Sequence, residues 1–301
     1  MEYTVKGLPN IGSSCYFNSS IQLCKLISDF SFKDENNSQN LFITDIQSVF
    51  DVENNQEELN KYLRLYSFIC QSMQYQPGTQ QDACEVVQFI VDKYVDLIQQ
   101  DIYKNKLICS SKQIITCLNC NKYRFGPEDM ESMIISQELN NSSNEEIDFK
   151  DFLISMISAH NINELKTECD CSSPIAQVQT IFTNLPEYLF IKVGRCKSDF
   201  TKIYKSLKFE YEFDIDYPIN LEKSIEGTDT TKLNRHYELI GIILHHGESI
   251  NNGHYSSIVR LQNNWIYCDD MMIRDFDMNS TTDIEYIQKN CCLLLYRHLT
   301  N

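Results

Sequence analysis

The hydrophobic pattern of this 301-residue chain changes near residue 103, and that change limits the folds open to it. Before it, apolar residues recur at helical spacing; the clearest stretch, QQDACEVVQFIVDKYVDLIQQ, places Val86, Val87, Ile90, Tyr94 and Ile98 on one face. After it, short alternating segments such as KQIITC, VQTIFTN, HYSSIVRL and CCLLLYR favour strands. Helices followed by antiparallel strands predict an α+β fold in one unit.

The pattern also places individual elements along the chain. Residues 18–30 and most of 41–100 are predicted to be helical. The polar stretches at 34–40 and 53–59 are expected to be loops or exposed helix turns, and 221–236 is expected to be a connection before the last strands.

Charge and cysteine content exclude several classes of protein. The formal net charge of −16 argues against nucleic acid or an anionic membrane as the main partner. The N-terminal MEYTVKGLPN lacks the basic flank and apolar core of a signal peptide, and no apolar run approaches the ~20 residues that span a bilayer. Thirteen irregularly spaced cysteines indicate reduced thiols. We therefore expect a protein inside the cell, in the cytoplasm, the nucleus or both. Nothing in the sequence fixes the oligomeric state, so a monomer is the default expectation.

The stretch GLPNIGSSCYFNSS, residues 7–20, joins turn-forming residues to a predicted helix. With Ser13 or Ser14 as the N-cap, Cys15 lies in the first helical turn, where the dipole and free N–H groups favour a thiolate. Those N–H groups and the Asn10 amide are suited to hold an oxyanion. The alternative is that Cys15 is a small buried hydrophobe, as most free cysteines are.

A base for this thiol is offered by NNGHYSSIVRLQNNWIYCDD. The segment predicts a hairpin whose open end brings His254 near Asp269 and Asp270, so that a carboxylate fixes the imidazole tautomer. With QNN as the loop, a strict ladder opposes Asp269 to Ser257, so a bulge or a longer loop is needed to reach His254. The alternative is a solvated hairpin with two surface acids.

Two further motifs have competing interpretations. His245 and His246 are rival bases, although neither is followed by a returning acidic strand. In PGTQQDACE, a capping box formed by Asp82 with Glu85, or by Thr79 with Asp82, is the local interpretation of that acid.

Two cysteine pairs flank about fifty residues. Cys117 and Cys120 form a C-x-x-C pair of the kind that binds zinc, and Cys169 and Cys171 form a C-x-C pair. Together they predict one four-thiolate site, although ligands one residue apart bind a single metal with more strain. Free thiols, or a site that has lost its metal, are the alternatives.

Three separate blocks resemble the conserved boxes of the ubiquitin-specific proteases, in the order of that family. GLPNIGSSCYFNSSIQ resembles the cysteine box, GTQQDACEVVQFIVDKY the QQDAHEF box, and YELIGIILHHGESINNGHYSSIVRLQNNWIYCDD the histidine box. LPEYLFIKVGRC and NCCLLLYR are similar to two of the family's strands. The resemblance covers nearly the whole chain.

The resemblance implies one catalytic domain over residues 1–301 with a papain-like fold. Its thumb would span about 1–105, its fingers about 106–180 and its palm about 181–301. The implied activity is deubiquitination: thiol-dependent hydrolysis of isopeptide, peptide or ester bonds at the C-terminal glycine of ubiquitin. The implied partners are ubiquitin and ubiquitinated proteins. No cofactor is implied for catalysis, and a structural zinc ion is implied for the fingers.

The resemblance also assigns roles, residue by residue. Cys15 matches the nucleophile, His254 the general base, Asp269 the third triad member, Asn10 the oxyanion-hole residue and Asp270 a helper of Asp269. The positions that match the substrate-binding surface are Asp82, Glu85, Gly253 and Tyr255; those that match the zinc ligands are Cys117, Cys120, Cys169 and Cys171.

The chain departs from the family pattern at several positions. Ser13 and Ser14 replace the usual Asn-Thr, and Cys84 and Val86 replace the histidine and phenylalanine of QQDAHEF. Every catalytic position keeps the expected residue type. A ubiquitin-binding scaffold without turnover, and an enzyme for a ubiquitin-like modifier, are the competing functions.

Overall fold

A computed structural model of the chain describes residues 5–27, 42, 45–46, 56–98, 106–126, 130–132, 134–139, 145–163, 169–197, 201–218, 221–225, 227–228, 230–249 and 252–299. The expected loop at 34–40 lies outside these residues. Among the described helices, none is both long and apolar enough to cross a bilayer.

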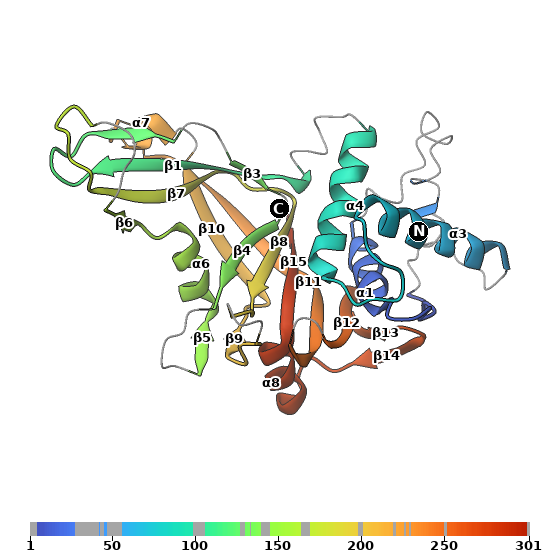
Figure 1. Ribbon diagram of the computed structural model, residues 1–301. Coiled ribbons are helices and arrows are strands. Elements are labelled where there is room, and N and C mark those ends of the chain that lie inside the picture. The colour runs from blue at the N-terminus through green and yellow to red at the C-terminus, as the bar shows by residue number, and fades with distance from the viewer. Residues whose placement is uncertain are drawn as a thin grey trace.

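The largest element is an eight-stranded sheet, here called the palm sheet (Figure 1). Its order is β14(Met272–Phe276), β13(Asn264–Asp269), β12(Asn252–Leu261), β11(Lys232–Ser249), β15(Cys291–His298), β8(Tyr188–Gly194) and β4(Ile134–Glu138), and β10(Glu212–Pro218) pairs with β11. All pairs are antiparallel except β4 with β8. The strands place apolar residues on the sheet faces and so form a core that is closed on both sides.

A second sheet, here called the fingers sheet, projects to the left in Figure 1. Its strands are β1(Cys109–Cys117), β2(Tyr123–Phe125), β3(Met130–Ser132), β6(His160–Ile162) and β7(Ala176–Asn184). The chain does not stay in this sheet between β3 and β6, because β4 crosses back to pair with β8. The segment expected to form the fingers therefore also supplies a palm strand.

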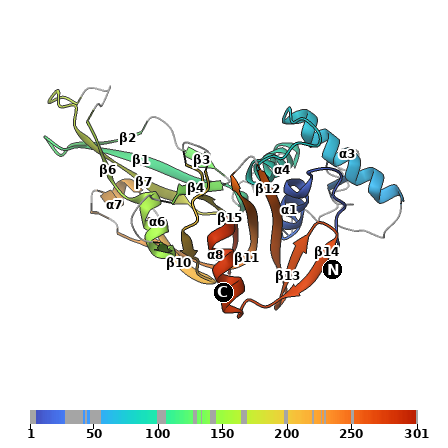
Figure 2. The ribbon, with the colours of Figure 1, turned by 60° about the horizontal axis from the view of Figure 1, so that its bottom comes forward.

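Three helices cover the palm sheet at the end opposite the fingers (Figures 1 and 2). They are α1(Cys15–Cys24), α3(Gln56–Ser72) and α4(Ala83–Ile98). Four of the five residues of the predicted apolar face of α4 are buried, namely Val86, Val87, Ile90 and Tyr94, and the side chain of Ile98 lies outside the described residues. Every residue of α1 is buried as well, because this helix packs against both β12 and α4.

Smaller elements complete the chain: β5(Glu146–Asp148), α6(Phe149–Ile157), β9(Ser206–Lys208), α7(Leu221–Ile225) and α8(Thr281–Asn290). The connection expected at 221–236 is instead partly regular, because β11 already begins at Lys232. The first residues of β11 are mostly polar and exposed. A search for alternating apolar residues therefore does not detect this part of the strand.

A buried arginine ties the end of β8 to α8. The guanidinium of Arg195 donates to the carbonyls of Cys291 (2.6 Å), Lys205 (2.6 Å) and Gln288 (2.5 Å). The side chain is only 6% exposed. Its planar set of donors therefore satisfies carbonyls from two separate segments at once, the end of α8 and the chain before β9.

We predict that Arg195→Leu lowers the free energy of unfolding by about 3 kcal/mol, because buried carbonyls lose their donors. Arg195→Lys is expected to recover little of this, since one ammonium group cannot reproduce the fork. Urea denaturation followed by circular dichroism measures both variants. A loss under 1 kcal/mol for Arg195→Leu would contradict the structural role.

Candidate active site

The turn before α1 is held by side chains rather than by a helix cap. The Asn10 Oδ1 accepts from the N–H groups of Gly12 (3.1 Å) and Ser14 (3.2 Å). Ser14 occupies the predicted N-cap position, but its hydroxyl accepts from the N–H of Ile11 (3.0 Å) and does not cap the helix. The first N–H groups of α1, beginning at Cys15, are thus not capped by this side chain.

Two successive residues of this turn have left-handed backbone conformations, with φ of 94° at Gly12 and 56° at Ser13. Glycine adopts this region at no steric cost, whereas serine does so less readily. The turn places Cys15 at the start of a fully buried helix, where its side chain is 2% exposed. The position of the thiol is therefore fixed by the core.

His254 and Asp269 meet through a register that the sequence did not predict. The loop is Gln262–Asn263, one residue shorter than expected, so Leu261 opposes Asn264 and Ser257 opposes Cys268. Continuing the ladder places Asp269 across from Ser256, and His254 lies two residues further along the same face. The two side chains join diagonally, with His254 Nε2 2.5 Å from Asp269 Oδ1, so no bulge is needed.

Cys15 and Asp269 both act on the imidazole of His254. Cys15 is the main influence that raises the pKa of His254 to about 9; burial opposes it, and Asp269 adds to it. An imidazole of this pKa carries its proton at neutral pH. The arrangement therefore places an imidazole that a carboxylate orients beside the thiol of a candidate nucleophile.

Asp270 holds the turn of the nucleophile in place. Its carboxylate accepts from the amide of Asn10 (2.7 Å) and from the amide of Asn18 (2.7 Å). One amide hydrogen of Asn10 is thereby engaged. The two acids of the D-D pair thus have different contacts: Asp269 contacts the imidazole, and Asp270 the residue that matches the oxyanion hole.

The two rival histidines lie near the site, but neither faces the thiol as a base. His246 bonds the Tyr286 hydroxyl (2.5 Å) and the Ser256 hydroxyl (2.6 Å) with its two nitrogens. Burial lowers its pKa to about 4, and it does the same for His245, which packs on the ring of Tyr255. Both are neutral at physiological pH, and the geometry favours His254.

Gln80 is a site residue that the sequence analysis missed. Its amide bonds the backbone of Gly253 twice, accepting from the N–H (2.7 Å) and donating to the carbonyl, and its nitrogen is 3.9 Å from the Cys15 sulfur. The first glutamine of QQDA was the signal for it. Gly253 must be glycine here, because a Cβ would lie 2.4 Å from the His246 carbonyl.

Asp82 has two partners. It directly precedes α4 and accepts from the N–H of Cys84 (2.7 Å), as a simple helix cap does, and its other oxygen is 2.9 Å from Lys192. The reciprocal bond of a capping box is not seen among the described residues, where Thr79 donates to the carbonyl of Gln76. Burial alone would lower the pKa of Lys192, but Cys84 and Asp82 raise it above its usual value. Lys192 was also missed, although a lysine within the apolar run LFIKVG was a visible signal. The carboxylate of Glu85 accepts from the Tyr75 hydroxyl (2.7 Å).

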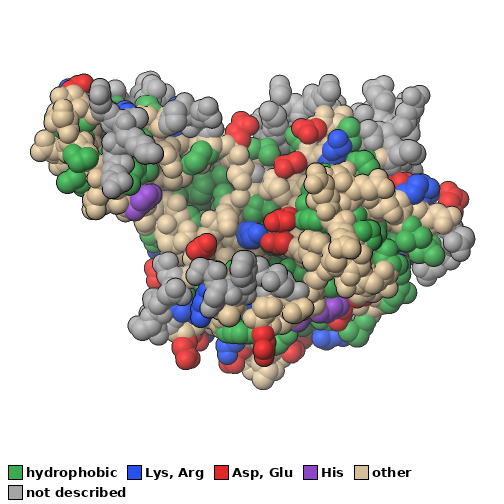
Figure 3. Space-filling view, viewed as in Figure 1, with side chains coloured by type: hydrophobic (Ala, Val, Ile, Leu, Met, Phe, Trp, Pro, Cys, Tyr) green, Lys and Arg blue, Asp and Glu red, His purple; other side chains and the backbone are tan. Residues whose placement is uncertain are grey.

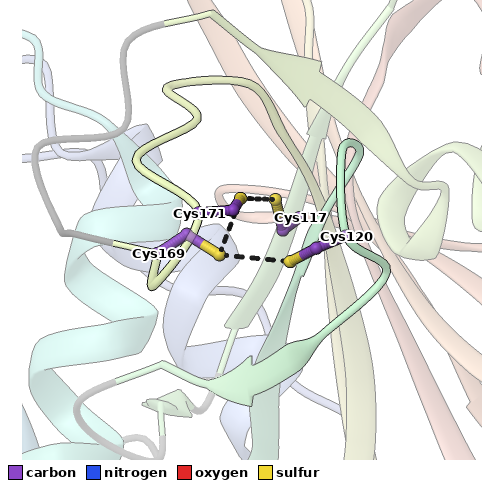
Figure 4. A group of neighbouring side chains, drawn as sticks. All are labelled: Cys117, Cys120, Cys169 and Cys171. Carbon is purple, nitrogen blue, oxygen red and sulfur yellow. Dashed lines mark hydrogen bonds between the residues drawn. The ribbon is translucent and has the colours of Figure 1, made fainter.

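The four cysteines of the two pairs come together at the end of the fingers sheet, where β1 ends and β7 begins (Figure 4). Their sulfurs are 3.5 Å apart for Cys117 and Cys171, 3.3 Å for Cys120 and Cys169, and 3.4 Å for Cys169 and Cys171. A tetrahedral zinc site with bonds of about 2.3 Å requires sulfurs about 3.8 Å apart. The C-x-C spacing is thus compatible with a four-thiolate cluster.

A cysteine paired with a histidine that a carboxylate orients, at the start of a buried helix, defines a thiol hydrolase. The family model of ubiquitin carboxyl-terminal hydrolases matches residues 6–296. The chain therefore belongs to this family of deubiquitinating cysteine peptidases, and its fold is the papain-like α+β fold of the ubiquitin-specific type.

Individual relatives and structures agree with this assignment. The chain is 26% identical over 302 residues to ubiquitin carboxyl-terminal hydrolase 20 of Arabidopsis thaliana, covering 90% of this chain and 41% of that protein. It is 23% identical over 309 residues to ubiquitin carboxyl-terminal hydrolase 12 of Salmo salar, covering 90% and 82%. The chain thus spans less than half of the first relative.

The fold is also similar to that of solved structures. A SAGA Ubp8/Sgf11/Sus1/Sgf73 DUB module bound to ubiquitin aldehyde matches with a TM-score of 0.78 at 19% identity, over 98% of this chain and 70% of that one. A second structure of the module, bound to monoubiquitin, matches with a TM-score of 0.77 at 18% identity, over 98% and 69%.

The raised pKa of His254 predicts the pH dependence of turnover. We expect kcat/KM to fall above about pH 9, as the imidazolium that protonates the leaving amine is lost. Asp269→Asn removes one of the influences that raise this pKa, so the alkaline limb should move to lower pH. Its kcat should also fall by about 10²-fold or more, because the tautomer is no longer fixed.

The measurement is a pH series from 5 to 10 with a fluorogenic amide of the ubiquitin C-terminus. The wild type serves as the reference for both kcat and the alkaline limb. An unchanged limb in Asp269→Asn would contradict the role of this carboxylate.

Proposed function

We propose that this chain hydrolyses bonds at the C-terminal glycine of ubiquitin with Cys15 as the nucleophile, His254 as the acid and base, and Asp269 as the orienting carboxylate. The single observation that supports this most strongly is that His254, whose pKa Cys15 raises, lies 2.5 Å from the Asp269 carboxylate. Cys15 comes from a helix near the start of the chain, and the other two residues come from neighbouring strands near its end.

In the first step the Cys15 thiolate attacks the carbonyl carbon of the glycine, and the C–S bond forms. The oxyanion accepts from the uncapped N–H groups at the start of α1 and from the free amide hydrogen of Asn10. When the intermediate collapses, the C–N bond breaks and the leaving lysine amine takes the proton of His254.

In the second step water attacks the thioester and gives a proton to His254. The C–S bond breaks, the C-terminal carboxylic acid of ubiquitin is released and loses its proton to solvent, and the thiolate–imidazolium pair is restored. Asp270 supports both steps indirectly, because it fixes Asn10 through one of the amide hydrogens.

The shape of the molecule suits a folded modifier with an extended tail. Figure 3 shows that the surface is hollowed between the projecting fingers sheet and α4. The Asp82–Lys192 pair lies where α4 meets β8. We place the di-glycine tail beside Gly253, where a Cβ would lie 2.4 Å from the His246 carbonyl, since the tail itself has no side chains.

Asp82 is already paired with Lys192. We therefore propose that the exposed Glu85 carboxylate, in the first turn of α4, is the freer partner for an arginine of the tail. Tyr255 is 6% exposed and packs on His245, so we propose that it shapes the channel wall. Our expectations of a monomer and of a cytoplasmic or nuclear location stay predictions.

The test of the main proposal is turnover of a ubiquitin C-terminal fluorogenic amide. Cys15→Ala and His254→Ala should each lower kcat by at least about 10³-fold, since nucleophile and base act as a unit. A ubiquitin probe with a C-terminal electrophile should label the wild type at Cys15. Tight ubiquitin binding without labelling would instead support a scaffold, and turnover retained in Cys15→Ala would contradict the mechanism.

We further propose that Cys117, Cys120, Cys169 and Cys171 bind one structural zinc ion. The turn of CLNC favours metal binding, since backbone N–H groups of Cys120 and Asn119 lower the pKa of Cys117 and so favour its thiolate. The ion would hold β1 and β7 together at the tip of the fingers, far from the thiol, with no part in the chemistry.

Elemental analysis of the purified protein should therefore find one zinc per chain. Cys120→Ser is expected to lose the metal and lower the melting temperature by several degrees, because a structural site contributes directly to folding. Cys196→Ser is a matched control, since this half-buried thiol lies outside the cluster. A zinc-free wild type with an unchanged melting temperature in Cys120→Ser would contradict the site.

A further inference from the structure

Two methionines project from the palm sheet beside the active site. Met271 and Met272 are 64% and 50% exposed, more than any other large hydrophobic residue in the described part of the chain. They lie at the tip of the β13–β14 hairpin, directly after the D-D pair. Single exposed hydrophobic side chains are common on proteins, but an adjacent pair at the rim of a site indicates a contact surface.

The backbone beneath these side chains is firmly held. Asp269 opposes Met272, which leaves a two-residue loop of Asp270 and Met271. The Asp270 carbonyl accepts from the N–H of Leu8 (2.9 Å), and the backbone of Met271 packs so closely on Gly7 that a Cβ there would lie 2.5 Å from the Met271 carbonyl. The backbone that carries the two methionines is therefore fixed in position.

Their position relative to the triad decides what they can contact. Asp269, which orients His254, is only two residues from Met271, and Asp270 bonds Asn10. Gln80 bonds the backbone of Gly253, next to His254, on the side that the proposed function gives to the tail. The tail and the leaving amine lie on opposite sides of the scissile bond, so the proposed function gives the leaving amine to the side of Asn10 and the two methionines.

We propose that Met271 and Met272 contact a second ubiquitin, the one whose lysine forms the scissile bond. This inference rests on the proposed function and adds to it a surface for the acceptor half of the substrate. That half must lie on the flank where its amine departs. Methionine suits the task, because its unbranched, polarizable side chain adapts to apolar surfaces presented in different orientations.

The test compares two substrates that differ only beyond the scissile bond. A ubiquitin fluorogenic amide has no acceptor protein, whereas a panel of diubiquitins with each lysine linkage does. We use M271Q/M272Q, since glutamine has nearly the size of methionine but is polar, with Leu233→Gln on β11 as the control because Leu233 is also exposed, at 43%.

For M271Q/M272Q we expect kcat/KM to fall by about tenfold for at least one diubiquitin, while kcat/KM for the amide changes less than twofold. The reason is that the two methionine contacts with the acceptor are made only by the larger substrate. Leu233→Gln should leave both substrates unaffected. Diubiquitin cleavage that is unchanged for every linkage would overturn the proposal. An equal fall for the amide and the diubiquitins would also overturn it, since the methionines would then act on the triad.

The same experiment distinguishes a failure of the proposed function from a failure of this inference alone. A wild type that cleaves neither substrate would overturn the hydrolase proposal and the acceptor surface together. A wild type that cleaves the amide, with a double variant equally active on every diubiquitin, would leave the hydrolase standing and remove only the surface.

Discussion

The burial of α1 against the palm sheet is the interaction on which the rest of the active site depends. All ten residues of this helix are buried, between β12 on one side and α4 on the other. Gly241 on β11 permits the close approach, since a Cβ there would lie 2.4 Å from the side chain of Leu23. Packing of this density fixes the start of the helix, and with it the Cys15 thiol, relative to the strand that carries His254.

The same packing brings polar groups to the edge of the core, and the D-D pair provides hydrogen-bond partners for them. The turn before α1 and the tip of the β13–β14 hairpin meet at the edge of the core, where their polar groups need partners. Asp270 provides them, because it accepts from Asn10 and Asn18 and its own carbonyl accepts from Leu8. One residue thus links the nucleophile's turn to the strand end that orients the base. The fold and the catalytic geometry are stabilised by the same contacts.

Division of the chain into two sheets separates the proposed tasks. The fingers sheet projects from the palm and carries the cysteine cluster at its end, far from the thiol (Figures 1 and 4). The palm and the three helices hold the chemistry. A small sheet that projects into solvent has little core of its own, and a four-thiolate metal site would replace that missing stabilisation.

The sequence by itself determined the class of fold, the family and the types of residue at each catalytic position. It could do so because the change of hydrophobic period and the order of the three boxes are properties of the chain alone. Only the tertiary structure decided how these residues meet. The His254–Asp269 contact depends on a loop one residue shorter than expected, and the strand at the start of β11 was hidden by its exposed, polar residues. The roles of Gln80, Lys192 and the two methionines likewise depend on which distant segments pack together, and long-range packing leaves no periodic signal in a sequence.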